Sequence, residues 1–402
     1  MKAYIDLLKS NETVKKLSFV QLIVYFGAWF SNVAIYTLLI KLNVSAEVVA
    51  FVAMLHFLAG VLQAPFSGTI IDRVDPKRLL LTLIIIEIFS TFGLLFIHTT
   101  AALPLLYLFI FFKMAAASFY FTTEMSLLPK ILFGEQLQKA NELHSIIWSF
   151  SYTLGMASSG FFVYYLGISM AFIVDISMFI VAFILLLSLE VSIKIEREKE
   201  NIFEMMQDSF RYIKRNPIAL HLMLLHAFLG LTAFDALVAL MVDRYYAGVI
   251  ATSLALGLLH SSRAVGLVVG PLLLRRFLSN RSIVYIFIAQ GVALLFWAMA
   301  MHDFYLSLFA SLFVGLFTTT LWSYTYTLLQ QNLEEKYYGR IVAYNDMLFL
   351  SSATFTSFMI GYLATKGVTL ESITVLIGGG FFVGALYFKW LIERKNIKEI
   401  NE

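Results

Sequence analysis

Long apolar runs separated by short polar breaks constrain this sequence more than any other feature. One run, LPLLYLFIFFKMAAASFYF, covers residues 103–121 and contains a single charged residue. A helix needs about 20 apolar residues to cross about 30 Å of hydrocarbon, whereas barrel strands alternate apolar and polar residues. The chain is 60% hydrophobic and only 14% charged, which a soluble domain could not bury. We therefore expect an all-α membrane protein.

Counting the apolar runs predicts about twelve transmembrane helices. Their approximate cores are residues 17–40, 48–71, 79–97, 103–127, 145–166, 169–189, 218–242, 251–274, 282–301, 304–328, 342–364 and 372–391. An even number of crossings places both termini on the same side of the membrane.

The positions of the 29 Lys and Arg residues predict which side that is. They fall in the N-terminal segment, the loops after even-numbered spans and the C-terminal tail, except for Lys41, Lys113, Arg244, Arg263 and Lys366. Loops rich in Lys and Arg stay in the cytoplasm. We therefore expect a multi-pass protein of a bacterial-type inner membrane with both termini cytoplasmic.

Several classes of chemistry find no support in the sequence. It contains no cysteine, no Walker loop and neither H-E-x-x-H nor G-x-S-x-G. No His, Asp and Glu residues cluster at metal-ligand spacing, and a net charge of +3 is too small to suggest nucleic acid. We expect no enzyme activity, no cofactor and no metal site.

The chain divides near its middle into two similar halves. FGAWFSNVAIYTLLIK (26–41) aligns with LGLTAFDALVALMVDR (229–244), at an offset of about 203 residues that recurs elsewhere. The predicted domains are a six-helix bundle at 1–190, a linker at 191–217 with an amphipathic helix, and a second bundle at 218–402. The repeat predicts pseudo-symmetric bundles with a substrate site between them. The amphipathic segment fits a helix on the inner membrane face or a solvated linker.

The stretch GTIIDRVDPKR (68–78) lies in the loop after the second span. It resembles the signature loop G-x-x-x-D-R-x-G-R-[RK]-[RK] of the major facilitator superfamily, with Asp75 and Pro76 as departures. The resemblance implies a conformational gate, in which Asp72 meets span 11 near Arg340 when the cytoplasmic side closes. The predicted gate residues are Gly68, Asp72, Arg73, Lys77, Arg78 and Arg340. Ordinary positive-inside topology explains the basic residues equally well.

Other stretches resemble one branch of that superfamily. LLPKILFGEQLQKANEL, LGMASSGFF and DSFRYIKRNP are similar to segments of drug:proton antiporters, including macrolide and siderophore exporters. The resemblance implies alternating access, a cavity lined by spans 1, 4, 7 and 10, and a monomer. It favours a proton-coupled exporter of an amphipathic small molecule. A lysophospholipid or other lipid transporter and a non-transporting sensor remain alternatives.

Ionisable residues inside spans are candidates for function because burying them in a membrane is costly. Lys113 could hold an anionic substrate group or modulate a carboxylate, and Glu87 could pair with it or carry a proton. Asp235 could belong to a proton relay or hydrogen-bond near Asn32. Arg263 could face the cavity or seal it. For each residue, a purely structural ion pair or hydrogen bond is the alternative.

Aromatic residues supply the remaining candidates. Tyr36 of the first span and Trp322 and Tyr326 of the tenth are expected to wall a site for a bulky amphipathic ligand. Aromatics make up 16% of the chain and occur in every span, so packing explains them almost as well. The expected partners are therefore a small-molecule or lipid substrate, protons and the lipid bilayer.

Overall fold

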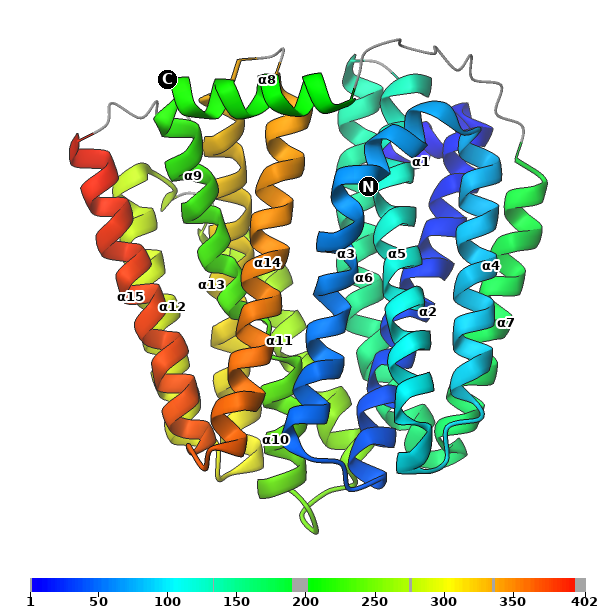
Figure 1. Cartoon of the computed structure of the whole chain (residues 1–402), viewed down its shortest axis with the longest axis vertical. Helices are drawn as coiled ribbons and strands as arrows, with labels where there is room; N and C mark the ends of the chain where they lie inside the picture. Colours follow the sequence, from blue (N-terminus) through cyan, green and yellow to red (C-terminus); the bar gives the residue numbers. More distant parts are fainter. Residues whose placement is uncertain (1, 133, 190–201, 275–276, 335–336, 395–402) are drawn as a thin grey trace. The chain divides into compact units, whose positions relative to one another are not determined.

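The computed structural model describes residues 2–132, 134–189, 202–274, 277–334 and 337–394, and this part of the chain is helical without strands (Figure 1). The helices are α1 (Lys2–Ser10), α2 (Glu12–Lys41), α3 (Ala46–Arg73), α4 (Pro76–Leu94), η1 (Thr100–Ala102), α5 (Leu103–Ile131), α6 (Gly134–Leu166), α7 (Ile168–Leu187), α8 (Ile202–Arg215), α9 (Pro217–Ala227), η2 (Phe228–Thr232), α10 (Asp235–Tyr245), α11 (Thr252–Leu274), α12 (Asn280–Ala300), α13 (Phe304–Gln331), α14 (Tyr338–Thr365) and α15 (Leu370–Arg394). The predicted all-α membrane fold is confirmed.

Within the described ranges, eleven helical segments are long and apolar enough to cross a membrane. The sequence predicts twelve, and the difference is α4, the third predicted span. This helix has only 19 residues, and they include Lys77, Arg78 and Glu87. It packs along α5 and α7 and lies beside the other long helices of its unit (Figure 1). We therefore treat α4 as the third span, made less apolar by the charges that it carries.

The departures from the signature loop form the start of α4. The Asp75 side chain accepts a hydrogen bond from the Arg78 backbone N–H at 2.9 Å, and Pro76 occupies the first turn. Asp is a preferred N-cap residue, and Pro suits the first helical position because its missing N–H would have no partner there. These two residues therefore begin the helix after a tight turn.

The seventh predicted span, 218–242, is not the continuous helix that the sequence pattern predicts. It consists of α9, the 3-10 turn η2 and α10, which begins at Asp235. A Cβ added to Gly230 would lie 2.5 Å from the Ser352 side chain and 2.6 Å from the Ala353 nitrogen of α14. The break thus occurs where the backbone meets a neighbouring helix, and such breaks are tolerated at membrane depth when protein covers them.

Two compact units are recognised in the chain. The first contains the described residues of Met1–Val44, Leu62–Glu198 and Ala251–Leu258. In it, α2 packs on α6 and α7, and α4 packs on α5 and α7. Its core contains apolar side chains such as Leu83 of α4 and Phe179 of α7.

The second unit contains the described residues of Ser45–Val61, Lys199–Ile250 and Leu259–Glu402. In it, α12 packs on α13 and α15, while α14 packs on α9 and η2. The predicted division into bundles at 1–190 and 218–402, joined by a linker at 191–217, stays a prediction. Residues 190–201 lie outside the described residues.

The predicted amphipathic helix is α8, which is attached to its unit by a tyrosine. The Tyr212 ring stacks on Tyr337 with centroids 4.1 Å apart. Its hydroxyl accepts hydrogen bonds from the Asn216 amide at 3.0 Å and from the Glu334 backbone N–H at 3.1 Å. The apolar side chains at helical spacing in this segment are Ile202, Phe203, Met206, Phe210 and Ile213. The first three lie outside the described part of the structure, and the Phe210 ring packs against Tyr344 of α14 with centroids 5.4 Å apart. Whether α8 lies on the membrane face stays a prediction.

Candidate functional site

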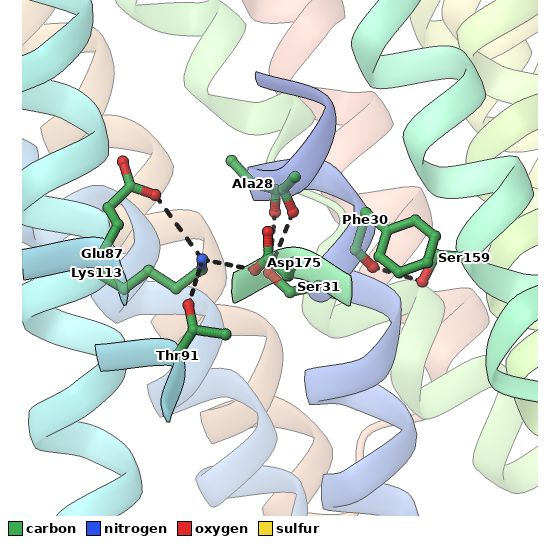
Figure 2. A network of polar contacts seen from close by, with 9 residues as sticks. Ala28, Phe30, Ser31, Glu87, Thr91, Lys113, Ser159 and Asp175 are labelled. Carbon is green, nitrogen blue, oxygen red and sulfur yellow. Dashed lines mark hydrogen bonds and ion pairs between the residues drawn. The ribbon is translucent and has the colours of Figure 1, made fainter. Parts of the chain in front are cut away.

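A buried lysine joins two carboxylates in the interior of the first unit (Figure 2). Lys113 of α5 donates hydrogen bonds to Asp175 Oδ2 of α7 at 3.0 Å and to Thr91 Oγ1 of α4 at 2.9 Å. Its Nζ lies 3.8 Å from Glu87 Oε2 of α4. The side chains of all three charged residues are 0% exposed. The structure thus brings Glu87 and Lys113 together, and it adds Asp175 to them.

The two carboxylates are held unequally. Asp175 shares a charge-assisted hydrogen bond with Lys113, whereas Glu87 makes only the longer ion pair. Neither oxygen of Glu87 has a hydrogen-bond partner among the described residues. With both acids ionised, one lysine would face two anions in a medium that solvates charge poorly. Glu87 is therefore the member of this cluster whose charge is least compensated.

Close packing fixes the position of Asp175. A Cβ on Gly27 of α2 would lie 2.5 Å from Asp175 Oδ1, so only glycine leaves room for this carboxylate. On the other side, Lys113 Nζ lies 4.6 Å from the centre of the Phe179 ring, within cation–π range. Four helices, α2, α4, α5 and α7, thus meet around one lysine. We call Glu87, Lys113 and Asp175 the lysine cluster.

A second group of ionisable residues lies at the helix break of the other unit. Asp235 is the first residue of α10, where a carboxylate is favoured by the helix dipole. Its Oδ1 lies 3.8 Å from His260 Nδ1 of α11. The Arg263 guanidinium lies 5.2 Å from the centre of the Phe234 ring, and its Nε has no hydrogen-bond partner among the described residues. The Asp235 side chain is thus 13% exposed at a break in the backbone, beside His260.

Aromatic rings surround a buried histidine in this second unit. His226 Nδ1 lies 2.8 Å from Thr325 Oγ1, and its ring packs against Trp322, Tyr326 and Phe349 at 4.5, 5.6 and 5.9 Å. The structure therefore groups Trp322 and Tyr326, the two predicted aromatics of the tenth span, around a buried histidine. We call these four rings the aromatic box.

The two candidates from the first span are both buried. Tyr36 is 1% exposed and Asn32 is 3% exposed. Among the described residues Asn32 Oδ1 finds no hydrogen-bond partner. The first unit contains Asn32 and the second contains Asp235. A hydrogen bond of Asp235 near Asn32 therefore stays a prediction.

The signature-loop residues are described in part. The surroundings of Gly68 and the Asp72 side chain lie outside the described part of the structure. Arg73 and Arg78 are exposed. Lys77 Nζ donates to the Leu187 carbonyl at 2.7 Å, at the C-terminal end of α7. A lysine there satisfies a free helix carbonyl, which gives it a structural use besides topology.

Arg340, the predicted partner of Asp72, has an acidic neighbour within its own unit. Its Nη1 lies 3.9 Å from Asp208 Oδ2 of α8, and both side chains are partly exposed. This contact links the linker helix to the start of α14. The Asp72–Arg340 gate stays a prediction.

Sequence reasoning missed one buried acid. Glu124 of α5 is 2% exposed and accepts a hydrogen bond from the Tyr25 hydroxyl at 3.4 Å. The sequence contained the information needed to find it, because Glu124 is a carboxylate within the predicted span 103–127. Glu87 was selected by the same criterion.

Comparisons with known proteins agree with this architecture. The sequence model of the Major Facilitator Superfamily matches residues 17–355. YkuC, an uncharacterised MFS-type transporter of Bacillus subtilis strain 168, is 27% identical over 184 residues, or 46% of this chain and 43% of that protein. The matched stretch therefore spans less than half of that relative.

Solved structures resemble the fold along nearly the whole chain. The nucleoside transporter NupG has a TM-score of 0.70 at 15% identity, covering 95% of this chain and 99% of its own. A D-xylose–proton symporter has a TM-score of 0.73 at 12% identity, covering 96% and 97%. At these identities the likeness shows the fold alone. Because the family model spans most of the sequence, this chain belongs to the Major Facilitator Superfamily, a family of transporters rather than enzymes.

Proposed function

We propose that this chain is a proton-coupled secondary transporter that exports an amphipathic small organic molecule by alternating access. The lysine cluster is the observation that carries the proposal. Two acids share one lysine where the side chains are fully buried, and Glu87 makes the longer contact with that lysine. An intramembrane ionisable group of this kind is typical of proton pathways.

The cluster can couple a proton to a conformational change through the charge on Glu87. With Glu87 protonated, Lys113 has Asp175 as its single anionic partner, and the cluster is neutral. With Glu87 ionised, the cluster carries one net negative charge. In a dry interior this difference changes the relative free energies of two conformations, so proton binding and substrate binding become linked.

The substrate class is proposed from the aromatic box. Trp322 and Tyr326 are only partly buried, so their rings offer a flat apolar wall, behind which the buried His226 and Thr325 contact each other at 2.8 Å. An apolar aromatic wall suits a ligand with a ring system. Among the structural neighbours, one is a nucleoside transporter and another is a proton symporter for D-xylose. The direction of transport, out of the cell, is proposed from the resemblance to drug:proton antiporters.

The proposal also includes the setting of the protein. It acts as a monomer in a bacterial-type inner membrane, with both termini in the cytoplasm. The loop residues 68–78 and Arg340 form its cytoplasmic gate. The lipid-transport and sensor alternatives have no observation in their favour among the described residues, and they are outcomes of the test.

The test uses purified protein in liposomes that contain a pH-sensitive dye and have an acidic interior. Ethidium, a macrolide, a nucleoside, D-xylose and a fluorescent lysophospholipid are added outside, one at a time. An antiporter accumulates its substrate while the interior becomes more alkaline. A symporter instead requires an acidic exterior, and a sensor binds a compound without moving it.

Glu87→Gln is the decisive variant because it keeps the size of the side chain and removes its titration. We expect it to abolish proton-driven accumulation while leaving exchange of labelled for unlabelled substrate intact. Glu12→Gln, at the exposed start of α2, is the matched control and should behave like the wild type. Unchanged proton coupling in Glu87→Gln would remove the lysine cluster from the mechanism.

A further inference from the structure

A second buried polar cluster lies along α5, apart from the lysine cluster. Glu124 accepts a hydrogen bond from Tyr25 of α2 at 3.4 Å. The Tyr25 ring meets His144 of α6 edge-on, with centroids 5.7 Å apart. His144 Nδ1 in turn contacts the Gln21 amide nitrogen of α2. These four side chains are each at most 6% exposed, and three spans contribute them.

This cluster differs from the lysine cluster because it has no strong cation. Among the described residues, no Lys or Arg forms an ion pair with Glu124. The titratable groups around it are Tyr25 of α2, Tyr120 one turn earlier on α5 and, in ring contact with Tyr25, His144 of α6. His144 Nε2 has no hydrogen-bond partner among the described residues. A carboxylate without a cation is costly in such surroundings, whereas a carboxylic acid can remain there as a hydrogen-bonded neutral group.

Tyr120 lies on α5 between Lys113 of the lysine cluster and Glu124. It lies one turn before Glu124 on α5 and is 0% exposed, and its hydroxyl has no hydrogen-bond partner among the described residues. Glu87 belongs to α4, which packs along α5. Glu124 follows Lys113 by eleven residues, which is about 16 Å along a helix. A phenol hydroxyl can donate and accept, so it suits a position between two carboxyl groups.

We propose that Glu124 is a second proton-binding site, whose proton exchanges with Glu87 past the Tyr120 hydroxyl. The exchange moves only a proton: the Glu124 carboxyl loses it, and the Glu87 carboxylate gains it. Proton binding at Glu124 stands without the proposed function, whereas its use in transport rests on that function.

Infrared difference spectroscopy tests the site directly, because protonated carboxyl groups have a C=O stretching band that carboxylates lack. The protein in lipid is taken from neutral to alkaline pH without any substrate. We expect wild-type protein to lose bands from two carboxyl groups, Glu87→Gln to keep the Glu124 band, and Glu124→Gln to keep the Glu87 band. Tyr25→Phe should shift the Glu124 band alone, because it removes the hydrogen bond to that carboxyl group.

The outcomes separate this proposal from the proposed function. If Glu124→Gln folds like the wild type and its difference spectrum is also unchanged, the second site is wrong even when proton-driven flux is normal. If no compound is transported while the Tyr25-sensitive band persists, the site stands and the transport proposal fails. Tyr120→Phe tests the connection: it should keep both bands but slow proton uptake by the Glu87 carboxyl, and an unchanged rate would exclude this route.

Discussion

Replacing Lys113 with methionine tests how strongly the lysine cluster holds the first unit together. The substitution keeps a long apolar stem and removes the ammonium group that lies 3.0 Å from Asp175 and 3.8 Å from Glu87. It also removes the hydrogen bond to Thr91. Two acids with 0% exposure are then left without a cation.

The expected cost is large because removing one partner of a buried ion pair leaves an uncompensated charge. Such changes destabilise proteins by about 3–5 kcal/mol, whereas replacing the complete set of charges by neutral groups is often nearly neutral. We therefore expect Lys113→Met to lose about 3–5 kcal/mol of unfolding free energy. Adding Asp175→Asn and Glu87→Gln should restore most of this loss. Asp175→Asn should restore more than Glu87→Gln alone, because Asp175 makes the shorter contact.

The assay is reversible unfolding in mixed micelles, followed by tryptophan fluorescence. Glu12→Gln, at an exposed ion pair, is the control and should change stability by less than about 1 kcal/mol. The reasoning is refuted if Lys113→Met is as stable as the wild type. It is also refuted if the triple variant is no more stable than the single one, since the loss would then come from packing rather than from unpaired charge.

Two further substitutions test close packing and the attachment of α8. Gly27→Ala places a Cβ 2.5 Å from the Asp175 carboxylate and should cost about 1–3 kcal/mol in unfolding assays, while Gly379→Ala, with open space around it, should cost little. Equal stability of these two variants would contradict the packing argument. Tyr212→Phe removes the hydroxyl that accepts from the Glu334 amide. At about 1 kcal/mol for the lost bond, hydrogen exchange in α8 should become about fivefold faster, and unchanged exchange would show that the hydroxyl does not hold the helix.

The sequence alone predicted most of the spans because hydrophobic length is a local property. The apolar runs coincide with helices such as α5 and α7, and the amphipathic pattern in the linker at 191–217 coincides with α8. Likewise, the charges of α4 were visible as exceptions to the apolar pattern. Glu87 and Lys113 could be proposed as partners because each is a lone charge that a membrane interior penalises.

Only the tertiary structure decided which groups meet. Asp175 became the nearest anion of Lys113 because Gly27 lets α2 and α7 approach at that point, and no periodicity in the sequence reports helix rotation. The break before Asp235 arises where Gly230 meets α14, so it depends on a neighbouring helix rather than on local propensity. Hydropathy determines that a segment enters the membrane, because each residue pays its transfer cost separately. Pairing inside the membrane depends on contacts between distant segments, and these exist only once the helices have packed.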